Sequence, residues 1–377
     1  MIISAQRLAA KATAKIPIGK GIKSFAMSAL ALKAMNSMMG APGNHSAFIK
    51  SDGSLWTMGK NDEGQLANST NSDLNIPTIV SLGSFAASLG NISIGGSVAF
   101  DFAKVAIGGG HTIYVSTEGG YTGSPSTKYA YTSGRNVGGQ LGDGTTTTRN
   151  NFQLAQTYVL NMGGRVVDAA AGSDFSLFLM DDGSLQGIGD NLRGQLGLGH
   201  ENNQSSLQLI MSSGVRHIAA GGRHTLIVKT DGSLWGMGRN DYGQLGLGDQ
   251  SHRNTPQQIL ASGVEHVEAN RRCSFIIMTD GSLWGMGDNT FGQLGTATSG
   301  PELYPIQLES SGVTQVSAGD RHTLYIKNDG TLWGMGDNNN GELGLGDMLQ
   351  RLSPVLIDSN VTQVSAGHDH TLYLDNN

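Results

Sequence analysis

The sequence has few of the residues on which several common protein classes depend. It contains one cysteine, Cys273, so no disulfide can form within the chain and a reducing compartment is permitted. Only 8 of its 377 residues are proline, and 14% are charged, whereas an average domain has about 25% charged residues. No apolar run reaches the roughly 18 residues that a membrane-spanning helix needs. These shortages exclude disulfide stapling, proline-rich disorder and a transmembrane helix.

Glycine, in contrast, is abundant. The chain has 56 glycines among 377 residues, roughly twice the average of about 7%. No Gly-X-Y period is present, which excludes a collagen-like chain. A glycine-rich sequence with little proline and little charge is typical of many short strands joined by tight turns.

Charge is distributed unevenly along the chain. The net charge is −6, but the first acidic residue is Asp52, and seven of the 24 basic residues precede it. From Asp52 onward, 17 basic side chains stand against 30 acidic ones. We therefore expect no nucleic acid to bind this acidic body. The basic start is suited to contacting an anionic surface or to serving as a targeting segment.

An internal repeat dominates the sequence. The segment Asp231–Gly238 reads DGSLWGMG, recurs at Asp280–Gly287 and returns with one change at Asp329–Gly336. A Gly-Gln-Leu-Gly segment follows, and a Gly-x-His-Thr-like segment precedes. The His position of that preceding segment occurs in seven copies, at His45, His111, Phe175, His224, Cys273, His322 and His370. A period of about 50 residues indicates repeated supersecondary units.

Each repeat reads as four short strands. Two apolar runs joined by Asp-Gly predict a hairpin with positive φ at both turn positions. The following Asn-x-x-Gly-Gln-Leu-Gly supplies another turn, and a Val-rich strand leads into the next unit. Four strands per unit, repeated in this way, predict an all-β propeller of four-stranded antiparallel blades. The count of seven copies predicts seven blades.

The motif set resembles the regulator of chromosome condensation repeat family. It combines Gly-x-x-His-Thr, Asp-Gly-x-Leu-Trp-x-x-Gly and Asn-x-x-Gly-Gln-Leu-Gly, and covers residues 41–377. The resemblance implies a seven-bladed β-propeller, in agreement with the independent count of His positions.

The seventh repeat stops after one Gly-x-x-His-Thr strand, so another segment is needed to complete its blade. We expect residues 21–28 to pair with the C-terminal strand and close the ring, because Phe25 and Met27 copy the Trp-x-Met spacing. Residues 27–38 also fit an amphipathic helix, and residues 1–40 also fit a targeting segment. The predicted organisation is a basic arm, 1–40, and a propeller, 41–377. Longer repeat spacings predict insertions near 67–104 and 120–128.

The sequence contains little that predicts catalysis. The His residues occupy equivalent places in different blades, so we expect packing and hydrogen bonding and no metal site. Cys273 lies beside two arginines but at a buried strand position, which favours an unreactive thiol over a reactive one. The four tryptophans, Trp56, Trp235, Trp284 and Trp333, share one repeat position and are expected in the core. We therefore expect no enzyme activity, no cofactor and no metal.

A rigid propeller without catalytic groups favours binding of a protein partner through one face and its loops. Arginine and aromatic side chains are common interface anchors. The partner-binding residues expected from repeat register are Arg193, Arg223, Tyr242, Arg272, Phe291 and Arg321.

Two alternatives stay open. The resemblance implies guanine-nucleotide exchange on a small GTPase, with the 120–128 insertion as a wedge, or inhibition of an enzyme by one propeller face. We expect a cytoplasmic location unless the basic arm directs the chain elsewhere. The sequence indicates neither the partner nor the oligomeric state.

Overall fold

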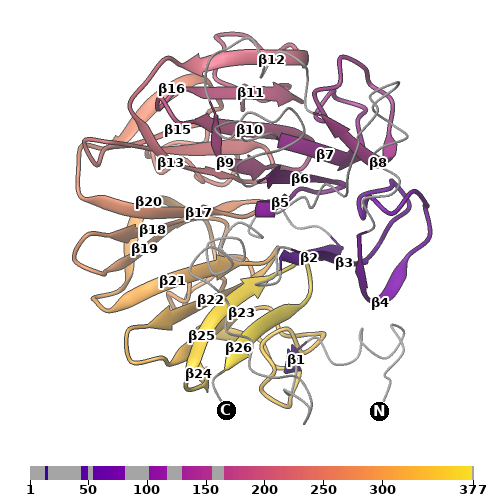
Figure 1. The fold of residues 1–377 in the computed structure, drawn as a ribbon. Coiled ribbons are helices and arrows are strands. Elements are labelled where there is room, and N and C mark those ends of the chain that lie inside the picture. Colours follow the sequence, from indigo (N-terminus) through magenta and orange to yellow (C-terminus); the bar gives the residue numbers. More distant parts are fainter. Residues whose placement is uncertain are drawn as a thin grey trace. The chain divides into compact units, whose positions relative to one another are not determined.

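A computed structural model describes residues 13–15, 44–49, 54–80, 102–116, 130–154 and 165–375. Every regular element in these ranges is a β-strand (Figure 1). A search of the same ranges finds no helix with the length and apolar character that a membrane crossing requires. The prediction of an all-β propeller is confirmed.

Five sheets are four-stranded blades, and each is built from strands that follow one another in the chain. Hairpin connections of this kind make neighbouring strands antiparallel. The strands are β5 (Phe102–Ile107), β6 (His111–Ser116), β7 (Ala130–Gly134) and β8 (Arg149–Leu154); β9 (Val166–Ala171), β10 (Phe175–Met180), β11 (Leu185–Gly189) and β12 (Gln204–Met211); β13 (Val215–Ala220), β14 (His224–Lys229), β15 (Leu234–Gly238) and β16 (Arg253–Leu260); β17 (Val264–Ala269), β18 (Cys273–Met278), β19 (Leu283–Gly287) and β20 (Glu302–Glu309); β21 (Val313–Ala318), β22 (His322–Lys327), β23 (Leu332–Gly336) and β24 (Arg351–Asp358).

Two further sheets have three strands each. One contains β2 (His45–Ile49), β3 (Leu55–Gly59) and β4 (Leu74–Ile79). The other contains β25 (Val361–Ala366) and β26 (Thr371–Asp375), with β1 (Thr13–Lys15) parallel to β26. The prediction of seven four-stranded blades is therefore wrong. The described residues form six blades of consecutive strands, because the last repeat supplies only two strands of its own.

The pairing of β1 with β26 lies earlier in the chain than the segment we expected there. Thr13 is opposite Thr371, and Lys15 is opposite Tyr373. Residues 21–28 and the alternative helix at 27–38 lie outside the described residues, as does the 120–128 insertion. Of the 67–104 insertion, the described parts include β4 and the start of β5. Closure of the ring by the N-terminal segment stays a prediction.

The described strands belong to two compact units. The first holds β2 to β12 and the start of β13. The second holds β1, the loop segment Arg193–His200, and the chain from Ala219 through β26. The six expected partner-binding residues all fall in the second unit.

The Asp-Gly hairpins differ from the predicted two-residue turn. Between β14 and β15, the Gly232 amide donates to the Lys229 carbonyl at 2.9 Å, and the Lys229 amide donates to the Ser233 carbonyl at 2.9 Å. This is a three-residue loop, in which only the residue after the type I turn needs a left-handed backbone. Gly232 has φ of +78°. The glycine alone therefore supplies the positive φ, and the prediction for the aspartate was wrong.

The aspartate of the hairpin accepts the last of two hydrogen bonds that link three side chains. Trp235 Nε1 donates to Ser233 Oγ at 2.9 Å, and Ser233 Oγ donates to Asp231 Oδ1 at 2.6 Å. The hydrogen bonds from Ser233 hold the pKa of Asp231 below its usual value. The Trp284 and Trp333 rings make the same contacts and pack at the margin of the core, where they are partly buried. The motif thus fixes each tryptophan across the end of a blade.

Buried histidines join consecutive blades. His224 Nε2 lies 2.9 Å from Ser274 Oγ, and that hydroxyl donates to the Gln244 carbonyl at 2.7 Å. A hydroxyl has one hydrogen, so the imidazole must donate through Nε2. Burial lowers the pKa of His224 to about 3, which keeps the ring neutral. His111 makes an equivalent bond to Ser176.

Candidate functional site

The loops that carry the expected partner-binding residues lie at one end of the strands. His224 at the start of β14 pairs with Gly238 at the end of β15. The Arg239 amide then donates to the Arg223 carbonyl at 2.8 Å, which links the β13–β14 and β15–β16 loops. Because the repeats share this register, the corresponding loops of the next two blades are arranged in the same way.

An asparagine and a glutamine hold each β15–β16-type loop in shape. Asn240 Oδ1 accepts the Leu245 amide at 2.8 Å, while its Nδ2 donates to the Asp249 carbonyl at 2.8 Å. Gln244 Oε1 accepts the Tyr242 amide at 2.9 Å. Both amide side chains are buried. The backbone beneath Tyr242 is therefore fixed before any partner arrives.

Arginines of one blade stack on aromatic rings of the preceding blade. The Arg272 guanidinium lies 4.7 Å from the centre of the Tyr242 ring, and that of Arg321 lies 4.5 Å from the centre of Phe291. Cation–π contacts of this length restrict the arginine side chain. Four of the six expected residues are thus brought together as two equivalent pairs.

The carboxylates that pair with these arginines are buried beneath them. Arg272 Nη1 lies 3.3 Å from Asp288 Oδ2, with the arginine side chain 32% exposed and the aspartate side chain 2% exposed. Arg271 Nη1 lies 3.5 Å from Asp320 Oδ2, with exposures of 47% and 4%. Arg321 lies 4.0 Å from the buried Asp337. In each of these pairs the arginine is therefore the more exposed partner, although Asp241 and Asp369 beside this region are also partly exposed.

We call this region the Arg-loop surface and define it by Tyr242, Arg271, Arg272, Phe291 and Arg321. Sequence reasoning missed Arg271 and the buried aspartates below it. The sequence signal was that Arg271 and Asp320 stand in two consecutive repeats at the position that Gly222 fills in the repeat before them.

Arg193 and Arg223 lie in loops of the same two kinds. The preceding blade has no aromatic residue at the repeat position of Tyr242 and Phe291. That position is filled by Arg193 in the preceding blade. The Arg193 amide donates to Gln195 Oε1 at 2.9 Å. Both arginine side chains are half-buried. A role in partner contact stays a prediction for all six residues.

A histidine–carboxylate pair adjoins the Arg-loop surface. His368 Nδ1 lies 2.7 Å from Asp369 Oδ2, and His368 Nε2 lies 3.4 Å from Asp320 Oδ2. The hydrogen bond to Asp369 raises the pKa of His368, while that to His368 lowers the pKa of Asp369. Within the described ranges, no three His, Cys, Asp or Glu side chains form a group that could hold a metal ion.

Cys273 lies in β18 beneath this surface. It is buried, and its Sγ donates to the Asp288 carbonyl at 3.0 Å. Burial raises the pKa of the thiol well above its usual value. Burial and the direction of this pKa shift both argue against a reactive thiol, as expected from the position of Cys273 in a buried strand.

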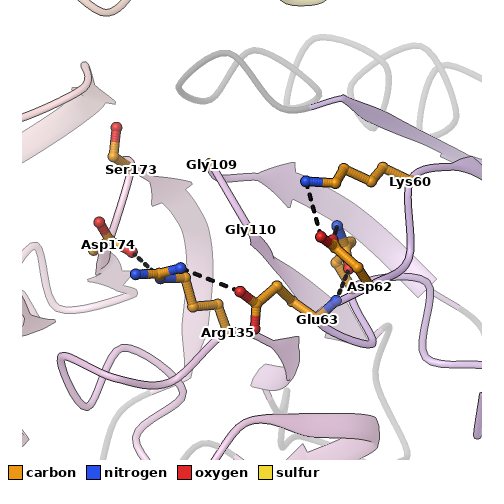
Figure 2. A pocket seen from close by; sticks show the side chains of 9 residues that line it. Lys60, Asp62, Glu63, Gly109, Gly110, Arg135, Ser173 and Asp174 are labelled. Atoms are coloured by element: carbon orange, nitrogen blue, oxygen red, sulfur yellow. Dashed lines mark hydrogen bonds and ion pairs between the residues drawn. The ribbon is translucent and has the colours of Figure 1, made fainter. Parts of the chain in front are cut away.

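The first unit contains a charged hollow at the equivalent place between blades. Figure 2 shows Lys60 paired with Asp62 at 2.9 Å, and Arg135 between Glu63 and Asp174 at 3.1 Å to each carboxylate. The cavity has a volume of about 200 Å³.

Sequence register explains this hollow. Gly110 stands where Arg272 and Arg321 stand in later repeats, and Glu63 stands where Tyr242 and Phe291 stand. No arginine–aromatic stack can form there, and Gly110 leaves the space empty. Sequence reasoning missed this pocket, whose signal was the loss of arginine and aromatic residues at these two positions.

The repeats and the fold of this chain have counterparts among known proteins. The RCC1-like domain matches residues 93–377, and the regulator of chromosome condensation (RCC1) repeat matches residues 52–115. The chain belongs to the RCC1-like domain family. The resemblance inferred from the motifs is confirmed.

Individual relatives of this RCC1-like chain have low sequence identity to it. The human X-linked retinitis pigmentosa GTPase regulator is 31% identical over 159 residues, which make up 42% of this chain and 13% of that protein. The structure of human WBSCR16 aligns with a TM-score of 0.74 at 22% identity, covering 89% of this chain and 85% of the other. Yeast Prp20p, described with its binding to Gsp1p and histones, aligns with a TM-score of 0.73 at 18% identity, covering 90% and 82%. The two structures share the fold of this chain.

Proposed function

We propose that this chain is a non-catalytic interaction module that binds a protein partner through the Arg-loop surface. The observation that carries the proposal is the fixed, outward-facing set of arginines. Arg272 and Arg321 are each stacked on a ring from one side and paired with a buried carboxylate from below. Fixing these long side chains in the free protein lowers the entropy lost on binding.

Each ion pair joins a partly exposed arginine to a buried carboxylate. Removing the arginine would leave that carboxylate buried without its partner, at a cost in stability. In the intact chain the pairs orient the guanidinium groups of Arg272 and Arg321. Arg193 and Arg223 would extend the contact surface at the neighbouring blade.

Affinity capture with a matched pair of double variants tests the proposal. R272Q/R321Q removes two positive charges from the Arg-loop surface. K229Q/K327Q removes two charges from the Asp-Gly end of the blades, where Lys229 lies over Trp235 and Lys327 pairs with Glu309. We expect proteins captured by the wild-type chain to be lost with the first variant and kept with the second. Because R272Q leaves the buried Asp288 without its partner, the melting temperature of each variant is measured first and capture is done well below it. Equal capture by R272Q/R321Q would reject the surface.

Nucleotide exchange on a small GTPase is the second candidate. It is favoured by the match to a human protein named as a GTPase regulator. The wedge assigned to residues 120–128 lies outside the described residues, so no geometry supports it. Release of fluorescent GDP from a panel of small GTPases, with and without the chain, distinguishes exchange from simple binding.

A further inference from the structure

We propose that the Arg-loop surface binds a carboxylate-rich peptide segment of its partner. This inference rests on the proposed function and adds the chemical class of the partner. It follows from how the charges of this surface are layered, from the geometry of the arginines and from the charge of the surrounding chain.

The layering leaves positive groups at the outer side. Asp288 and Asp320 are almost fully buried, whereas the guanidinium groups of Arg271 and Arg272 reach solvent. Arg321, also exposed, has no contact shorter than 3.9 Å among its ion pairs. A buried carboxylate lies within 3.5 Å of Arg271 and within 3.3 Å of Arg272. A guanidinium has five N–H groups, so this pairing leaves others for a ligand. Incoming carboxylates would meet donors already held in place.

Arginine geometry favours a carboxylate as the ligand. A guanidinium presents parallel N–H groups that match the two oxygens of a carboxylate. Two of the three arginines, Arg272 and Arg321, also lie over the Tyr242 and Phe291 rings, which restricts their side chains. One unpaired atom also lies here, since Asp320 Oδ1 is buried without a hydrogen-bond partner. The other oxygen of the same carboxylate, Oδ2, is the one that lies 3.5 Å from Arg271 Nη1.

The rest of the chain argues against a long polyanion. From Asp52 onward the chain carries 30 acidic and 17 basic side chains. Salt limits electrostatic interactions to about 8 Å at physiological ionic strength. A short acidic segment would feel mainly the Arg-loop surface, whereas a nucleic acid running beyond it would meet the acidic remainder. The charge balance therefore selects an acidic peptide over a polyphosphate backbone.

Fluorescence anisotropy with defined peptides tests the inference on the full chain. The probe is a labelled peptide of repeated Glu-Gly pairs, and the comparison peptide has Gln in place of every Glu. We expect the Glu peptide to bind, the Gln peptide not to bind, and added salt to weaken binding. The variant R271Q/R321Q should bind the Glu peptide about tenfold more weakly or worse. The control K229Q/K327Q, with the same loss of charge, should bind like the wild type.

A second variant separates fork geometry from charge alone. R271K/R321K keeps both charges but loses the paired N–H groups, so it should bind measurably more weakly than wild type. The inference is overturned if the Gln peptide binds equally well, if K229Q/K327Q weakens binding as much as R271Q/R321Q, if the lysine variant binds as wild type does, or if an oligothymidylate of equal charge binds more tightly than the Glu peptide. Should the Glu peptide fail to bind while partner capture still depends on Arg272 and Arg321, the acidic segment is rejected and the proposed function is retained.

Discussion

Glu268 offers a sharp test of how this fold tolerates a buried charge. The residue lies in β17, is 4% exposed, and its Oε1 has no hydrogen-bond partner. Desolvation by burial raises the pKa of this carboxyl well above 4.5. The equivalent position in β21 is Ser317, as the strand registers show. The fold itself therefore does not require a carboxyl there.

The pH dependence follows from the direction of this pKa shift. Because the folded-state value is raised, the folded chain binds more protons than the unfolded chain at pH values above 4.5. Ionising the buried carboxyl lowers the free energy of unfolding. This loss is absent below pH 4.5 and grows as the pH rises toward the folded-state pKa. Between pH 4.5 and the folded-state pKa, this cost of burying the charge increases by about 1.4 kcal/mol per pH unit. Replacing Glu268 with alanine also leaves a cavity, which offsets part of the gain in stability.

We therefore expect Glu268→Ala to be more stable than the wild type at pH 7, by on the order of 1 kcal/mol or more, and to lose this advantage at pH 4.5. Urea unfolding followed by tryptophan fluorescence, at a series of pH values between these limits, measures the difference. Glu265→Ala, which removes an exposed carboxyl from the same strand, is the matched control. Parallel pH curves for Glu268→Ala and wild type would refute the reasoning, as would a less stable variant at pH 7.

Two further predictions concern contacts between blades. His224→Phe removes the bond to Ser274 and should lower the free energy of unfolding by about 1 kcal/mol, measured by urea denaturation; an unchanged value would mean that the bond adds nothing. Gly246 has φ of +65°, and a Cβ there would collide with Met286 Sδ. Gly246→Ala should therefore cost more than the approximately 1–2 kcal/mol of a left-handed alanine. Gly199→Ala, with φ of +80° and no atom within 4 Å of the added Cβ, isolates that backbone cost; equal losses of stability in the two variants would contradict the collision.

Much of the fold could be predicted from local pattern. Alternating apolar runs, Asp-Gly turns and the spacing of His positions were enough to predict an all-β propeller, because these signals act within one blade. The turn type was wrong because a three-residue loop also uses Asp-Gly but places only the glycine at positive φ, as Gly232 shows. The blade count was wrong because a repeat that supplies two strands still contains the His motif.

The candidate surface was predicted only in part. Repeat register placed Tyr242, Arg272, Phe291 and Arg321 at one end of the blades, since loops at equivalent positions must emerge on the same side. Nothing in the sequence showed that Arg272 would stack on a ring 30 residues earlier. That contact depends on how one blade packs against the next.

The sequence by itself determined the repeating strands, the hairpins that join them and the loops in which arginines occur, because each depends on neighbours along the chain. Only the tertiary structure decided which charges are buried and which are exposed. Asp288 and Asp320 are as polar as any surface aspartate in the sequence, yet packing between blades buries them and leaves Arg271 and Arg272 outside. Burial depends on residues far apart in the chain, and it sets both the cost of Glu268 and the sign of the charge that a partner meets.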